Sequence, residues 1–194
     1  MVGRPVDERR RDELLDAVVG YAVERGFAEL TWRPLALALG VTPTTLVHRF
    51  GSKEGMIEAI QRRLRERILT ETAPLEGEGF DLARYARRVW QRVSDPVREG
   101  EFRLFFAVYG QALQAPDTFE DFLGHVVADS TTALRTVQGD GVDHAIAVRT
   151  ATLTIATIRG LLLDLLTTGD RERVDAAADA FFDALRVPTG TSGR

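Results

Sequence analysis

Apolar residues recur three or four positions apart along most of this 194-residue chain, which is the spacing of one face of an α-helix. No stretch alternates apolar and polar residues long enough to predict a strand. Glycine and proline interrupt the helical pattern at Gly26, Gly40, Pro96, Pro116 and Gly169. The pattern therefore predicts an all-α protein. Its longer helices are expected over residues 7–24, 53–70, 81–93, 101–114, 117–137, 142–168 and 170–186.

The segment from Thr31 to Gly55 predicts two short helices joined by a tight turn, followed by the start of a third helix. Ala36 is small enough to let the first two helices approach closely. Gly40 can adopt the positive φ that the turn requires, and Leu46 falls on the inward face of the second helix. This is the layout of a helix-turn-helix, which places its second helix in the major groove of DNA.

Residues that favour helix starts precede these helices. Thr31 can cap the first, and Thr42 can cap the second. Pro43 then occupies the first helical position, where its missing N–H has no cost. Ser52 can cap the helix that follows. These caps support the same three helix boundaries.

The outward face of the second short helix is predicted to be polar and uncharged, which suits hydrogen bonding to base edges. Lys53, the only lysine in the chain, comes directly after the Ser52 cap. An acidic residue would stabilise the helix better there, so we interpret Lys53 as a contact to DNA phosphate. The residues predicted to bind DNA are Thr31, Arg33, Thr42, Thr44, Thr45, His48, Arg49 and Lys53.

This segment resembles the N-terminal domain of the TetR family of bacterial transcriptional regulators, from about Asp7 to Ile60. The resemblance rests on Thr31, the Ala-x-x-x-Gly-Val turn, the recognition helix, Phe50 and the Ser-Lys-Glu that begins the next helix. It implies a three-helix helix-turn-helix DNA-binding domain and a C-terminal helical domain for ligand binding and dimerisation. Because the middle of the chain diverges widely in such proteins, the resemblance says little about the ligand.

Two residues depart from the family pattern. Val47 stands where the family usually has a tyrosine that touches a phosphate, so one DNA contact is in question. Pro34 stands where an acidic residue often closes a capping box with Thr31. The Thr31 hydroxyl could then bond the N–H of Arg33 or remain available for a phosphate.

The resemblance, together with the Pro- and Gly-containing break at residues 74–79, implies three parts of the chain. A DNA-binding domain is expected over residues 1–52, a connecting helix over 53–72, and a ligand-binding and dimerisation domain over 73–194. Residues 1–70 carry a net charge of +2 (12 Lys and Arg, 10 Asp and Glu), and the remainder carries −6. This small asymmetry agrees with DNA binding by the first part but does not establish it.

The last two predicted helices are unusually apolar, and Arg159–Asp170 resembles the junction of the two family helices that pair across a dimer. A four-helix bundle between two copies or a core within one chain would each bury them. We favour a homodimer, since a palindromic operator matches a two-fold protein. The expected interface residues are Ile158, Leu162, Leu165, Leu166, Val174, Ala178, Phe181 and Phe182.

Aromatic residues gather in the middle helices, where they could form core or line a pocket for a mostly apolar or aromatic small-molecule effector. Polar residues nearby could orient such a ligand. The residues predicted to line the pocket are Trp90, Phe102, Phe105, Phe106, Tyr109, Phe122, His125 and Arg159.

The resemblance implies a homodimeric repressor that binds a palindromic DNA operator and leaves it when a small molecule binds. The sequence does not distinguish a repressor from an activator. An alternative is a helical-bundle metal enzyme. Asp121 with His125, and Asp140 with His144, have the spacing of a metal pair, but no Glu-x-x-His motif occurs. A second alternative is a scaffold protein with a degenerate helix-turn-helix, which would bind no DNA specifically.

Composition narrows the function classes. The chain has no cysteine, which excludes disulfides and thiolate chemistry. We expect no metal, no cofactor and no catalytic residue. The richest apolar run, Leu161–Leu166, is short and contains Asp164, so no membrane span is expected. The first residues hold no hydrophobic signal core, which predicts a cytoplasmic protein associated with the nucleoid.

Overall fold

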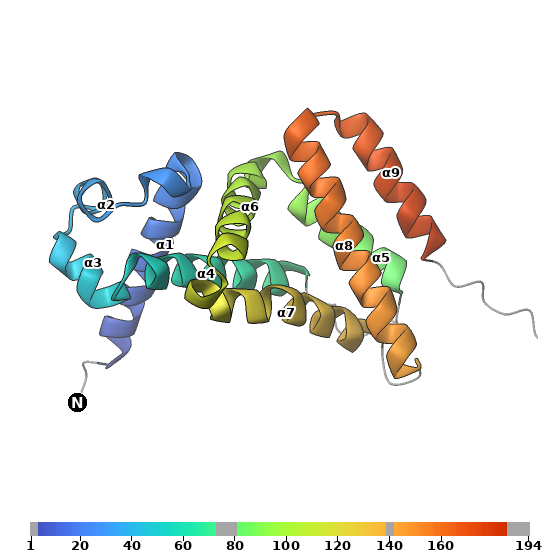
Figure 1. Ribbon diagram of the computed structural model, residues 1–194, viewed down its shortest axis with the longest axis horizontal. Coiled ribbons are helices and arrows are strands. Elements are labelled where there is room, and N and C mark those ends of the chain that lie inside the picture. Colours follow the sequence, from blue (N-terminus) through green and yellow to red (C-terminus); the bar gives the residue numbers. More distant parts are fainter. Residues whose placement is uncertain (1–3, 73–80, 139–141, 186–194) are drawn as a thin grey trace, which may run out of the picture. The chain divides into compact units, whose positions relative to one another are not determined.

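The computed structural model describes residues 4–72, 81–138 and 142–185, and every regular element within them is helical (Figure 1). The predicted all-α class is confirmed. The α-helices are α1 (Arg4–Arg25), α2 (Trp32–Leu39), α3 (Pro43–Phe50), α4 (Lys53–Thr72), α5 (Leu82–Val93), α6 (Glu99–Gln114), α7 (Glu120–Gln138), α8 (His144–Thr168) and α9 (Arg171–Ala184). Short 3-10 turns lie at Phe27–Glu29, Pro96–Arg98 and Pro116–Phe119.

Most helix boundaries agree with the sequence expectations. The first helix begins at Arg4 rather than near Asp7. The helix expected from residue 117 begins at Glu120, because Pro116 first starts a 3-10 turn. Local signals account for the agreement elsewhere. Asp81, for example, caps α5 by accepting the N–H of Arg84 at 3.0 Å.

The helices form two compact units that are not consecutive in the chain. The first unit holds residues up to 68 together with residues 97–126, and the second holds residues 69–96 and those from 127 on. The first unit includes α6 because α6 packs on α1: a Cβ on Gly100 would lie 2.8 Å from Cγ1 of Val23. The functional division expected at residues 52 and 72 stays a prediction.

The core of the first unit joins α1, α2, α3 and α4 to α6 and the start of α7. Val18, Leu35, Leu46 and Met56 are fully buried in this core. On α6, Val108 is buried in the same cluster. A helix-turn-helix of two eight-residue helices has little core of its own, so these neighbours hold it in place.

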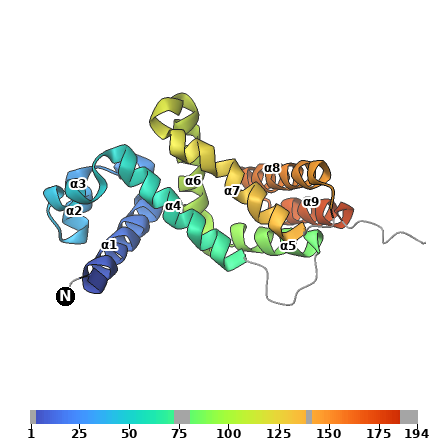
Figure 2. The ribbon, with the colours of Figure 1, turned by 90° about the horizontal axis from the view of Figure 1, so that it is seen from below.

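In the second unit, α5 packs against both α8 and α9, and the last two helices run side by side (Figures 1 and 2). Polar contacts also join α5 to α9. The Nε1–H of Trp90 donates to Asp175 at 2.9 Å, and the guanidinium of Arg87 bonds Asp179 and Asp183 at 3.0 and 2.8 Å. Gly169 ends α8 with φ 69°, the left-handed conformation that allows the chain to reverse into α9.

Helix α8 corrects one sequence expectation. It spans 25 residues, with a mean hydropathy of 1.5 over its most apolar 18-residue stretch, so it is long and apolar enough to cross a bilayer by length and composition. The sequence reading counted only the short Leu161–Leu166 run and missed the apolar residues that precede it. Only 28% of that stretch is buried within the chain. A large apolar surface of α8 is therefore exposed.

Candidate nucleic-acid interface

The turn between α2 and α3 fixes the angle between these two helices. Gly40 has φ 64° and ψ 30°, a left-handed conformation that disfavours residues with a Cβ. The N–H of Val41 donates to the carbonyl of Ala36 at 3.0 Å, and that of Gly40 to Leu37 at 3.3 Å. These two bonds form a Schellman motif, which ends α2 and leads directly into α3. Ala36 is 2% exposed and Leu46 is fully buried, as the sequence predicts.

The start of α3 is held by its own threonines. The hydroxyl oxygen of Thr42 accepts the N–H of Thr45 at 3.1 Å, which confirms the predicted cap, and Pro43 occupies the first turn. The two hydroxyl groups of Thr42 and Thr45 also share a hydrogen bond of 2.9 Å. By contrast, Thr31 precedes α2 with an extended backbone, but its side chain makes no cap bond. The Thr31 hydroxyl is therefore left for another partner, such as a phosphate oxygen to which it could donate.

With Leu46 buried, α3 turns a continuous surface outward. Thr44, Thr45, His48 and Arg49 are all exposed on it. A short helix that buries one side chain and exposes short polar ones has the surface expected of a helix that enters the major groove of DNA.

Cationic side chains flank this surface. Arg33 on α2 and Arg49 on α3 are exposed, and neither forms an ion pair with any residue that the structure describes. Lys53 opens α4, and its ammonium lies 5.2 Å from the ring centroid of Phe27, also without an acidic partner in the described ranges. Positive charge left unpaired on the protein is available to DNA phosphates.

The start of α4 is positioned by two small residues. The Ser52 hydroxyl accepts the N–H of Gly55 at 3.0 Å, which confirms the predicted cap. A Cβ on Gly55 would lie only 2.4 Å from the carbonyl oxygen of Phe50. Glycine therefore allows the end of α3 to approach the first turn of α4, which holds Lys53 beside the recognition helix.

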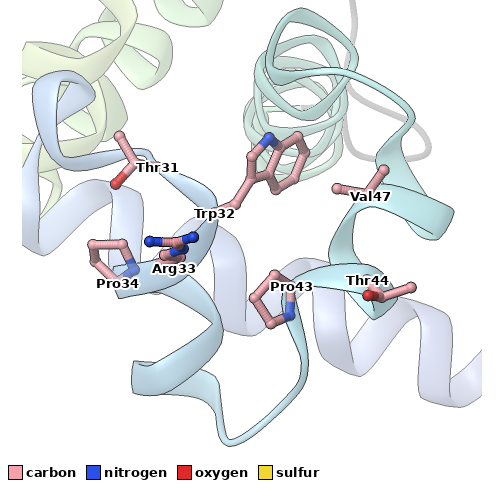
Figure 3. A pocket seen from close by; sticks show the side chains of 7 residues that line it. All are labelled: Thr31, Trp32, Arg33, Pro34, Pro43, Thr44 and Val47. Carbon is pink, nitrogen blue, oxygen red and sulfur yellow. The ribbon is translucent and has the colours of Figure 1, made fainter.

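A hollow of about 560 Å³ lies between the starts of α2 and α3 (Figure 3). Trp32 and Val47 occupy facing sides of it, and Val47 is 42% exposed. Sequence reasoning assigned no role to Trp32, and it gave Pro43 only a role at the start of α3. The hollow is lined by Thr31, Trp32, Arg33, Pro34, Pro43, Thr44 and Val47.

Comparisons with known proteins agree with this geometry. The sequence model of the family described as "Bacterial regulatory proteins, tetR family" matches residues 14–60, which run from α1 into α4. The N-terminal domain of this chain belongs to the TetR family. The resemblance inferred from the sequence is thereby confirmed.

Two curated relatives of this TetR-type domain are named HTH-type transcriptional repressor KstR2. The protein from Rhodococcus jostii (strain RHA1) is 35% identical over 72 residues, which cover 37% of this chain and 35% of the relative. The protein from Mycolicibacterium smegmatis is 36% identical over 75 residues, covering 34% of this chain and 37% of the relative. The chain thus matches about a third of the length of these relatives.

Solved structures extend the likeness of fold to nearly the whole chain. A transcriptional regulator from Rhodococcus sp. RHA1 superposes with a TM-score of 0.75 at 24% identity, covering 90% of this chain and 95% of that one. GusR from Salmonella enterica gives a TM-score of 0.66 at 25% identity, covering 95% and 97%. The TetR-type domain is therefore followed by a helical C-terminal part of the same general fold as in these proteins.

The residues predicted to line an effector pocket divide between the two units. Trp90 and Arg159 belong to the second unit, and the other six belong to the first. Phe102 and Phe122 are buried at 5% and 7% exposure. The ring of Phe105 lies 5.2 Å from that of Phe106 and 6.4 Å from that of Phe122, while His125 is exposed. The rings pack against one another as core, and the pocket stays a prediction.

The predicted dimer residues also sort into two groups. Leu166 and Phe181 are half-buried. The other six, Ile158, Leu162, Leu165, Val174, Ala178 and Phe182, are at most 8% exposed within the single chain. A side chain buried by its own chain has little surface left for a partner. The apolar residues that α8 does expose are Ile146, Leu153 and Leu163, at 47, 56 and 49%.

No group of three or more His, Asp or Glu side chains within the described ranges is arranged to hold a metal ion. The possible pair of Asp121 and His125 has another explanation. Nδ1 of His125 lies 2.7 Å from the backbone carbonyl of Asp121, so the imidazole bonds the helix backbone. The other pair contains Asp140, which lies outside the described residues.

Proposed function

We propose that this chain is a transcriptional repressor of the bacterial cytoplasm that acts at the nucleoid. In this proposal a homodimer binds a palindromic operator through two copies of α3 and is released by a small molecule. The exposed polar face of α3, flanked by cations that have no acidic partner among the described residues, is the observation that carries the proposal. The names of the curated relatives support it.

Contacts to DNA divide by chemistry. The proposal assigns Arg33, Arg49 and Lys53 to the phosphate backbone, which positions the protein but reads no sequence. It assigns Thr44, Thr45 and His48 to base edges in the major groove, with Thr31 and Thr42 at the adjoining backbone. Val47 lacks the hydroxyl of the usual tyrosine, so the nearby hollow offers apolar contact, for example to a thymine methyl group, in place of a polar one.

Dimerisation is assigned to the exposed face of α8, where Leu153 and Leu163 are exposed. Leu153, Ala156, Gly160 and Leu163 follow one another at three- and four-residue spacing and are all exposed. Gly160 has no atom within 4 Å of where a Cβ would lie, so a partner helix could approach closely there. A second copy of α8 would cover this stripe, as in a helical bundle. Leu166 and Phe181 would lie at its margin.

Release requires a ligand that binds the DNA-free form more tightly than the DNA-bound form. Coupling of this kind is typically about 1–3 kcal/mol, enough to change operator affinity several-fold or more. One structure of similar fold is described as a multidrug binding protein, EbrR, complexed with imidazole, and another as a TetR variant in complex with minocycline. Those descriptions support a small-molecule effector for this chain, which we expect to be mostly apolar or aromatic.

Titration onto DNA tests the proposal. The protein is added to labelled DNA from upstream of its own coding sequence, and to a shuffled duplex of equal length, over a range of salt concentrations. We expect strong preference for the upstream DNA with two chains per site. Equal affinity for both duplexes, followed by no enrichment of any genomic sequence in a pull-down, would contradict it.

Sedimentation of the free protein tests the dimer separately. We expect the mass of two chains at micromolar concentration, independent of DNA. A monomer that remains in solution would contradict the dimer. A monomer that co-floats with phospholipid vesicles would also contradict it, and would assign the exposed face of α8 to a membrane instead.

A further inference from the structure

The hollow between the starts of α2 and α3, which we call the α2–α3 hollow, has apolar walls (Figure 3). The walls are formed by Trp32 and Pro34 of α2 and by Pro43 and Val47 of α3. Trp32 and Val47 lie on facing sides. The fold leaves part of this apolar surface uncovered, since Val47 is 42% exposed and Trp32 is only partly buried against the core of the first unit. An apolar group could therefore pack between the two side chains.

The α2–α3 hollow is continuous with the proposed DNA surface. Its remaining lining residues, Thr31, Arg33 and Thr44, are exposed and are all assigned to DNA above. Arg33 forms no ion pair with any residue that the structure describes, so its charge attracts a polyanion to the rim of the hollow. Charge and position therefore both favour DNA as the partner that covers the α2–α3 hollow.

Phosphate is a poor match for the walls of the α2–α3 hollow. The start of a helix binds phosphate through backbone N–H groups that have no other partner. Pro34 and Pro43 have no backbone N–H. The N–H of Thr45 is already bonded to the Thr42 hydroxyl at 3.1 Å. The walls thus favour an apolar group of DNA, and phosphates would lie at the rim beside Arg33.

The 5-methyl group of thymine is the one apolar group that base pairs present in the major groove. A helix-turn-helix places the start of its second helix against base edges, while its first helix crosses the backbone. Val47 lies on the second of these helices, and Trp32 begins the first. A methyl group at a base edge near the backbone of its own strand would therefore lie between Val47 and Trp32.

We propose that the α2–α3 hollow receives the 5-methyl group of a thymine in each half of the operator, where it packs against Val47 and Trp32. This role rests on the DNA binding proposed above and refines it. Val47 and Trp32 thereby determine a preference for thymine at one position of each half-site, separate from the hydrogen bonds assigned to the polar face of α3. The volume of about 560 Å³ exceeds that of a methyl group, so the sugar of the same nucleotide fits beside it.

Replacement of thymine by deoxyuridine tests the proposal, because it removes the methyl group and leaves every hydrogen-bonding group of the base in place. The full chain is titrated with the preferred upstream duplex, in which each thymine is replaced in turn, symmetrically in both half-sites. We expect at least one pair of positions where affinity falls about fourfold for each methyl group removed. A duplex that is preferred over shuffled DNA but has no such position would overturn this proposal and leave the proposed function intact. A protein that prefers no duplex would overturn both.

A matched pair of variants locates the methyl group in the α2–α3 hollow. Val47→Ala shortens the wall of the hollow, and Leu37→Ala shortens an exposed apolar residue of α2 that does not line it. Alanine favours a helix, so both variants should fold, which circular dichroism checks. We expect Val47→Ala to bind the thymine and deoxyuridine duplexes within twofold of each other, and Leu37→Ala to keep the preference of the parent protein. A full preference in Val47→Ala, or its loss in Leu37→Ala, would overturn the proposal.

Discussion

The single hydroxyl group of Thr45 can take part in two interactions. Its oxygen shares a hydrogen bond with the hydroxyl of Thr42, while its position on the outward face of α3 suits a base contact. Both are compatible, because a hydroxyl group offers one hydrogen and two lone pairs. Thr42 can donate to Thr45 while Thr45 donates to a base. The cap of α3 thus holds in place, before DNA binds, the side chain that we propose reads a base.

This arrangement predicts the behaviour of Thr45→Ala. The backbone N–H of residue 45 still bonds Thr42, so the protein should remain folded. We expect operator affinity to fall by about 1–3 kcal/mol and affinity for random DNA to change little, since the lost group reads sequence. Thr45→Ser, which keeps the hydroxyl, should retain most of the affinity. Equal losses on operator and random DNA, measured by titration, would remove Thr45 from base readout.

Single residues were predictable where the signal is local. The caps at Thr42 and Ser52 and the positive φ of Gly40 depend on neighbours within a few positions, and the sequence identified all three. The free hydroxyl of Thr31 was left open between two outcomes.

At the scale of elements, the junction of α8 and α9 is closed by ion pairs. Asp170 caps α9, and Arg173 forms two hydrogen bonds to Asp164, at 2.7 and 2.9 Å. Asp164, which interrupts the apolar Leu161–Leu166 run, thus has its partner in the first turn of the next helix. The hydrogen bond from Arg173 lowers the pKa of the Asp164 carboxyl.

The Asp164–Arg173 pair predicts a pH-dependent effect of Asp164→Asn. A carboxyl whose folded pKa is lowered stabilises the protein above its unfolded pKa, and this contribution is lost as the pH falls through the folded pKa. The variant should melt below the parent protein at about pH 7, and the difference should shrink well below the ordinary pKa of 3.8. The shift should be modest, as both groups are partly exposed. Asp117→Asn, on an exposed turn, is the control for thermal melting.

The exposed stripe of α8 predicts a second effect at this scale. Leu153→Glu places a charge on the surface assigned to the dimer, and should convert the dimer to monomer in sedimentation experiments. Leu113→Glu makes the same change at a leucine of α6 with nearly the same exposure, 59% against 56%, and should leave the dimer intact. A dimer that survives Leu153→Glu would place the interface elsewhere.

The extents of the helices could be predicted from periodicity, but the faces of α8 could not. A helix that is apolar on several sides gives no single stripe to read. The sequence therefore selected Ile158, Leu162 and Leu165, which the structure buries, over the exposed Leu153 and Leu163. The choice between those faces depends on where α5 and α9 pack.

At the scale of the whole molecule, the DNA-binding unit is larger than its motif. Residues 97–126 complete its core, although they come after a segment that belongs to the other unit. The periodicity of a single helix does not show which distant helix it contacts, so the packing of α6 on α1 could not be predicted from the sequence. The chain crosses between the units three times, within α4, within the 3-10 turn Pro96–Arg98 and within α7.

Contacts to DNA phosphates depend on the charge of the protein and not on the base sequence of the DNA. Lys53→Ala should weaken binding to operator and random DNA alike, and should reduce the slope of log affinity against log salt by about one unit. Arg103→Ala, on the exposed side of α6, removes a cation outside the proposed interface and should leave the slope unchanged. An unchanged slope for Lys53→Ala would exclude its phosphate contact.

The position of the single lysine has a practical meaning for covalent chemistry. Apart from the chain's own α-amino group, Lys53 is the one primary amine in the sequence, and it lies where α3 meets α4. Amine-reactive dyes, cross-linkers and sensor-chip coupling will therefore concentrate on the proposed DNA surface. Acetylation of lysine, which removes the charge, would act on this one side chain only. In a protein immobilised through its amines, the proposed DNA surface would face the support and could not bind the duplex.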